Sequence, residues 1–75
     1  YWEVLMKIGN KLIAALKTKY RSDFVQALAT LEVYIANPVG IGEHPQHLEE
    51  MDKLVAQMAD ADDKLAVLAA EYPDA

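Results

Sequence analysis

The prolines and glycines of this chain are few, and their placement limits what the chain can fold into. They lie at Gly9, Pro38, Gly40, Gly42, Pro45 and Pro73. Because proline and paired glycines interrupt helices most strongly, the chain is broken once in its middle and again near its end. The stretches between are rich in the helix formers Ala, Leu, Lys, Glu, Gln and Met. The sequence therefore predicts an all-α single domain over residues 1–75, with helices at about 3–36 and 45–72 and a turn at 37–45.

Apolar residues of the first segment recur at helical spacing. Their ladder is Leu5, Ile8, Leu12, Leu16, Tyr20, Phe24, Leu28, Leu31 and Ile35. The mean step of about 3.75 residues exceeds the 3.5 of a heptad seam, so this stripe is expected to drift around a straight helix. Ser22–Asp23 could cap a new helix start. One long helix is nevertheless expected, because the ladder keeps its phase through that point.

The second segment has a regular heptad pattern. Its steps alternate between three and four residues over Met51, Leu54, Met58, Ala61, Leu65, Leu68 and Tyr72. This spacing is typical of a coiled-coil seam. Leu48, Val55 and Ala69 widen the stripe toward a bundle-type face.

The segment between the helices has the composition of a tight reversal. Pro38 stops the first helix, and Pro45 suits the first turn of the second. Gly40 and Gly42 permit the positive φ that such a turn needs. A structural turn is the expected interpretation, and a recognition loop is the alternative.

The two halves carry opposite charge, which favours an antiparallel hairpin. Residues 1–37 hold five bases and three acids, whereas residues 38–75 hold two bases and nine acids. With the turn near residue 41, the basic stretch Lys17–Arg21 is expected opposite the acidic stretch Asp60–Asp63. Exposed pairs of this kind influence register more than stability.

Size points to self-association. A 75-residue chain without cysteine cannot add a disulfide or a thiolate metal site, and two helices do not enclose a core. The first helix would also overhang the second at Trp2–Ile8. We therefore expect a homodimer that forms a four-helix bundle. The expected contact residues are Leu5, Ile8, Leu12, Leu16, Met51, Leu54, Met58, Leu65 and Leu68.

No pattern of catalytic residues is evident, so neither an enzyme nor a small-molecule substrate is expected. Thr18, Ser22 and Thr30 are hydroxyl candidates without a neighbouring histidine. The paired glycines follow a helix rather than a strand, which is unlike a phosphate-binding loop. The sequence indicates a structural or interaction protein with no cofactor.

Two groups of residues resemble metal ligands. Glu43, His44 and His47 make half a site, which Glu49, Glu50 or a second subunit would have to complete. A polar helix entry is the expected interpretation. The aspartates at Asp60–Asp63 lack the glycine turn and distal glutamate of an EF-hand, so we expect a solvated acidic face and no metal.

Charge and hydropathy limit the remaining partners. A net charge of -5 disfavours nucleic-acid binding, although Lys7–Arg21 is basic and an acidic helix could mimic nucleic acid. No apolar run approaches the ~18 residues of a membrane span. The absence of cysteine fits a reducing compartment, so a cytoplasmic protein is expected. Met6-Lys7-Ile8 reads like a translation start, which leaves the status of Tyr1–Leu5 open.

Three segments carry a resemblance to a known group of proteins. They are Leu31–Pro45 (LEVYIANPVGIGEHP), Glu49–Leu54 (EEMDKL) and Ala61–Leu65 (ADDKL). The chain resembles short uncharacterised proteins of large tailed bacteriophages, marine ones in particular. The resemblance implies a protein made inside an infected bacterium, as an accessory factor. It implies no catalytic activity. The alternative to self-association is a small modulator that docks on a host or phage protein through the overhang at Trp2–Ile8 or through the acidic second helix.

Overall fold

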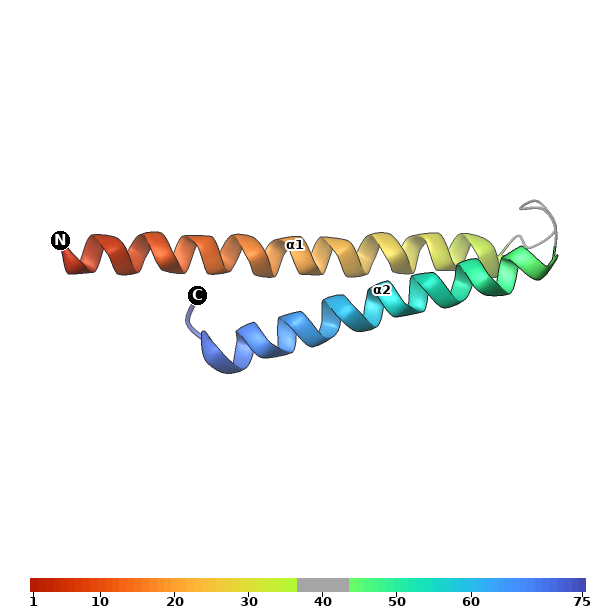
Figure 1. Cartoon of the computed structure of the whole chain (residues 1–75). Helices are drawn as coiled ribbons and strands as arrows, with labels where there is room; N and C mark the ends of the chain where they lie inside the picture. The colour runs from red at the N-terminus through yellow and green to blue at the C-terminus, as the bar shows by residue number, and fades with distance from the viewer. Residues whose placement is uncertain (37–43) are drawn as a thin grey trace.

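Two long helices lie side by side in this computed structural model, which describes residues 1–36 and 44–75 (Figure 1). Helix α1 spans Trp2–Ala36 and helix α2 spans His44–Glu71. At 1.5 Å per residue they are about 52 and 42 Å long. They run antiparallel, so the predicted all-α hairpin is confirmed, with helix bounds within one residue of those expected. The predicted turn residues Pro38, Gly40 and Gly42 lie outside the described residues.

Helix α1 packs on α2 through a heptad seam. Seven of its less exposed positions step alternately by four and three residues: Ile13, Lys17, Tyr20, Phe24, Ala27, Leu31 and Tyr34. Leu12, Leu16 and Ile35 of the predicted ladder are exposed and lie outside this seam. A mean step of 3.5 residues keeps a stripe facing one partner helix, whereas the longer step of the predicted ladder carries it away from that partner. The expectation of one uninterrupted helix through Ser22–Asp23 is confirmed.

The seam of α2 is the one that its spacing predicts. All its members from Met51 to Leu68 are partly or fully buried, while Tyr72 at the end stays half-exposed. His47 extends the seam by one step toward the start of α2. Its ring meets the ring of Tyr34 edge-on, with centroids 5.6 Å apart. Pro45 is the second residue of α2, as expected for the first turn of a helix.

The core of a single hairpin is thin. Ala27 and Ala61, each 2% exposed, are the buried apolar residues within the described ranges, and no large side chain there is fully buried. The radius of gyration is 17.1 Å, against about 11 Å for a compact domain of this length. The accessible surface is 5834 Å², against about 4,600 Å² for a compact monomer of this mass. One copy therefore leaves much apolar surface uncovered.

Charge pairing follows a different pattern from the predicted one. Within residues 1–36 and 44–75, the ion pairs join side chains of the same helix: Lys19–Asp23 at 2.9 Å, Lys53–Glu50 at 3.2 Å and Lys64–Asp60 at 2.8 Å. Short-range pairs along one helix form more readily than pairs that span the seam. Arg21 and Asp62 border one hollow from opposite helices but form no ion pair. The register is therefore fixed by the apolar seam.

Neither helix, over the part of the chain that the structure describes, combines the length and apolar character that crossing a membrane requires.

Candidate interaction surface

The residues predicted to mediate self-association fall into two groups in the structure. Five of them lie on α2 and are already partly buried against α1: Met51, Leu54, Met58, Leu65 and Leu68. The other four lie on α1 and remain exposed: Leu5, Ile8, Leu12 and Leu16. The second group is therefore the part of the predicted surface that a partner can reach directly.

The N-terminal end of α1 extends beyond α2 (Figure 1). Trp2 is 72% exposed and Ile8 is half-exposed there, so the predicted overhang at Trp2–Ile8 is present. A shallow hollow of about 440 Å³ marks the point where α2 ends. It is lined by Met6, Gly9, Asn10, Leu12, Ile13 and Tyr72. This end of the hairpin thus offers an apolar recess next to an uncovered helix.

A second heptad stripe runs along this part of α1, beside the seam that contacts α2. We call it the N-terminal stripe, and its members are Trp2, Leu5, Gly9, Leu12 and Leu16. The next heptad position after Leu16 is Lys19, so the apolar stripe ends at Leu16. At 100° per residue, Lys7 and Lys11 fall on the opposite side of the helix. The ladder predicted from the sequence does not contain this stripe, because the ladder continues from Leu5 to Ile8 rather than to Gly9. The stripe's own steps of three, four, three and four residues are nevertheless present in the sequence.

Gly9 is the unusual member of the N-terminal stripe. A Cβ atom built at this position meets nothing within 4 Å, so packing within the hairpin does not require glycine. Glycine inside an exposed helix is less stable than alanine by roughly 0.5–1 kcal/mol. The hairpin alone therefore gives no reason for a glycine at this position.

Lys17 fixes the end of α2 against α1. It is only 6% exposed, and its ammonium group donates hydrogen bonds to the main-chain oxygens of Tyr72 at 2.6 Å and Ala75 at 2.9 Å. The amide of Ala75 also donates to the oxygen of Tyr72, at 3.3 Å, as the chain turns back toward α1 (Figure 1). A cation at a helix C-terminus satisfies carbonyls that lack partners within the helix. Lys17 thereby positions Tyr72 at the edge of the hollow.

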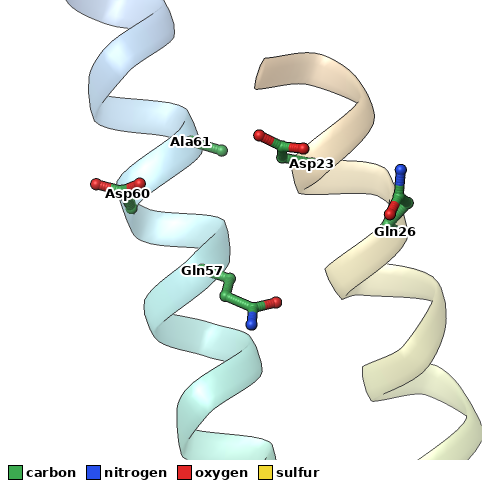
Figure 2. Close-up of a pocket in the computed structure, with 5 residues that line it drawn as sticks. All are labelled: Asp23, Gln26, Gln57, Asp60 and Ala61. Carbon is green, nitrogen blue, oxygen red and sulfur yellow. The ribbon is translucent and has the colours of Figure 1, made fainter. Parts of the chain in front are cut away.

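A polar cleft of about 200 Å³ lies between the helices near their middle (Figure 2). It is lined by Asp23, Gln26, Gln57, Asp60 and Ala61. Figure 2 shows Asp23 and Gln57 pointing into the space between the helices, whereas Asp60 points away from α1. The two carboxylates are paired with lysines of their own helices, and the Gln26 amide donates to the Ser22 hydroxyl at 3.0 Å. These groups are held by local contacts, and they form no recognisable catalytic arrangement.

The two lysines that pair with the carboxylates of this cleft also lie over the ring of Tyr20, which is a seam residue. The ammonium groups of Lys19 and Lys64 lie 5.5 and 5.3 Å from the centre of the Tyr20 ring, within the range of cation–π contacts. The hydrogen bond from Lys64 to Asp60, and the charge of that carboxylate, raise the pKa of Lys64 above its ordinary value of 10.5. This group is solvated, so the shift reflects a surface pair.

The hydroxyl groups considered as nucleophiles are engaged along α1. Thr18 donates to the carbonyl of Ala14 at 3.0 Å, and Thr30 donates to the carbonyl of Gln26 at 2.9 Å. Such bonds back to the preceding turn are common for threonine in helices.

The candidate metal ligands are only partly described by the structure. Glu43 and the side chain of His44 lie outside the described residues, and the ring of His47 packs on Tyr34. Among the described side chains, no three His, Asp or Glu residues are grouped as metal ligands would be.

Comparison of the chain with protein families, curated proteins and solved structures found no match.

Proposed function

We propose that this chain is a non-catalytic assembly protein whose hairpins associate in pairs into a four-helix bundle. The observation that carries the proposal is the combination of a thin core with exposed apolar stripes. Ala27 and Ala61 are the buried apolar residues of the described part of the chain, whereas Trp2, Leu12 and Leu48 are each more than 60% exposed. Apolar area left in water is the main driving force for protein association.

The exposed area is sufficient for a dimer. The hairpin exposes about 1,200 Å² more than a compact monomer of its mass. A standard specific interface buries about 800 Å² from each partner. A second copy that covers the exposed stripes would therefore bring this chain to the surface area expected for its mass.

The charge distribution also suits a second copy of the same chain. Residues 1–37 carry a net charge of +2 and residues 38–75 carry -7. The basic half of one copy can therefore lie near the acidic half of its partner. Complementary charge of this kind favours correct orientation more than it adds affinity.

Thermal unfolding at several protein concentrations tests this proposal. Because association stabilises the folded state by mass action, Tm should rise over a 100-fold increase in concentration. Leu12→Asp should abolish that rise, since Leu12 is 64% exposed in the hairpin and its loss leaves the seam intact. Thr18→Asp, on the opposite side of α1, is the matched control and should retain the rise. A concentration-independent Tm for the unmodified chain would show that the hairpin does not self-associate.

An accessory protein that modulates a host or phage protein is the second candidate, and the exposure of Trp2 favours it. Tryptophan is enriched among the residues that dominate binding energy at protein interfaces. In this alternative, the overhang at Trp2–Ile8 docks on a different protein in the bacterial cytoplasm, as the phage resemblance implies. The alternative requires a monomer whose Tm is unaffected by its own concentration.

A further inference from the structure

We propose that the second copy docks antiparallel on the N-terminal stripe, with the two-fold axis of the dimer passing at Gly9. This inference rests on the proposed self-association and specifies its surface and geometry. The stripe keeps heptad spacing from Trp2 to Leu16, about four turns of exposed helix, without a charged residue. Heptad spacing is the pattern that one helix presents to another.

The stripe is nearly symmetric about its middle member, Gly9. Leu5 and Trp2 lie four and seven residues before Gly9, and Leu12 and Leu16 lie three and seven residues after it. Laid antiparallel on a copy of itself, the stripe sets Trp2 level with Leu16 of the partner subunit. Leu5 then lies one residue, about 1.5 Å along the axis, from level with Leu12 of the partner subunit. Gly9 then meets Gly9 of the partner subunit. A two-fold interface requires this self-complementarity, because the same patch serves both copies.

The crossing point accounts for the glycine. Interhelical distance depends on the side chains at the contact, and a residue without Cβ lets two backbones approach closely. The space around Gly9 is open in the hairpin, and the hollow beside it reaches to Tyr72. A partner helix that crosses at Gly9 would cover this hollow with its own apolar side chains.

Charge is compatible with this arrangement. Lys7 and Lys11 lie on the side of α1 away from the stripe, so they stay solvated when two α1 helices pair. The net charge of -5 per copy arises in the second half of the chain, and the paired stripes carry none of it. Self-repulsion between the two copies is therefore small at the contact.

The geometry determines how far the hairpins overlap. The α1 helices would pair over residues 2–16, which is about 21 Å of helix. The α2 helix of each copy ends beside this overlap, where Lys17 holds Tyr72. The four-helix assembly would therefore be staggered along its length, with the turn ends of the two hairpins pointing in opposite directions.

Trp2 makes the inference testable, because it is the one tryptophan in the sequence. Light scattering and tryptophan emission are measured together over a dilution series. We expect Trp2 emission at a shorter wavelength in the dimer and a return to longer wavelength on dissociation. A dimer whose Trp2 emission does not change on dissociation would refute this docking mode and leave the proposed function standing. A monomer at every concentration would refute both.

A pair of variants locates the crossing. Gly9→Gln places a side chain at the proposed axis and should weaken the dimer at least ten-fold. It should not reduce helix content, because glutamine is the better helix former. Ala29→Gln is the matched control on an exposed position of α1 outside the stripe, and it should dissociate like the unmodified chain. Equal affinity for Gly9→Gln and the unmodified chain, or a loss confined to Ala29→Gln, would overturn the inference.

Discussion

The side chain of Lys17 donates a 2.6 Å hydrogen bond to the main-chain oxygen of Tyr72, 55 residues further along the chain. Lys17 occupies a seam position where apolar residues are the rule, and it is nearly inaccessible to solvent. A polar residue at one such position specifies register at some cost in stability. Here the lysine also donates to main-chain oxygens just beyond α2, at Tyr72 and Ala75. Lys17 therefore holds the chain at the end of α2 and favours the same register as the apolar seam.

Removing the Lys17 ammonium group should loosen the end of α2. Lys17→Met keeps the aliphatic stem in the seam but loses both hydrogen bonds to main-chain oxygens. Hydrogen bonds from charged groups contribute about 1.5–3 kcal/mol, so we expect at least ten-fold faster exchange of the Tyr72 and Ala75 amides, which are hydrogen-bonded in the hairpin. Thr18→Met, at an exposed neighbouring position, should leave that exchange unchanged. Equal exchange in the two variants would show that Lys17 does not hold this end.

The small buried residues of the seam should not tolerate enlargement. Ala61 is 2% exposed at the edge of the polar cleft, and Ala61→Leu would force three more apolar carbon atoms between the helices or into that cleft. Overpacking of this kind typically costs 1–3 kcal/mol. Urea denaturation should show a loss of about that size. Ala66→Leu, an exposed position on α2, is the matched control and should change stability by less than about 0.5 kcal/mol. A smaller loss for Ala61→Leu than for the control would contradict the described packing.

Apolar seam residues of α2 should be required for the hairpin itself. Leu54 and Leu65 are both partly buried against α1, so replacing both with aspartate places two charges in the seam. Unpaired charges in apolar surroundings are strongly destabilising. The double variant should lose most of its helical circular dichroism at 25 °C. Replacing the exposed Val55 and Val67 with aspartate adds the same charge outside the seam, and helicity should be retained. A fully helical Leu54/Leu65 double variant would show that the seam is misassigned.

The pair of Lys64 and Asp60 should produce a defined pH dependence. Hydrogen bonding and attraction to Asp60 raise the pKa of Lys64 in the folded state above 10.5. A raised lysine pKa adds stability that is fully present below the unfolded-state pKa and is lost as pH rises through the folded-state pKa. The difference in stability between the unmodified chain and Asp60→Asn should therefore be constant near neutral pH and shrink above about pH 10.5. Side-chain NMR titration of Lys64 should show its pKa falling toward 10.5 in Asp60→Asn. An unchanged pKa would contradict the assigned cause.

The sequence predicts α2 better than α1, for a physical reason. From Met51 to Leu68 the seam positions of α2 are all apolar, so counting apolar spacing finds the packed face. The seam of α1 includes Lys17 and Ala27, one charged and one small. A ladder built from large apolar residues therefore omits both and includes Leu12 and Leu16, which belong to the N-terminal stripe. Two stripes on one helix cannot be separated by hydropathy alone, because the partner helix decides which one is buried.

At the open end of the hairpin, one feature was predicted from the sequence and two others were not. Comparing the lengths of the two helical patterns predicts the overhang at Trp2–Ile8, and the structure has it. The hydrogen bonds of Lys17 were not predicted, because they depend on where the chain turns back after Tyr72. The open space at Gly9 was likewise not predicted, since it is a property of packing. Contacts that join distant segments become visible only when the register is known.

The solution mass of the unmodified chain decides whether the hairpins self-associate. Light scattering on a sizing column should give about 16.6 kDa, twice the 8.3 kDa of one chain. The same measurement on a chain that starts at Met6 removes Trp2 and Leu5 from the N-terminal stripe, and it should give a weaker dimer that dissociates on dilution. A mass of about 8.3 kDa for the unmodified chain at all concentrations would contradict self-association and leave a different protein as the partner of the exposed stripe.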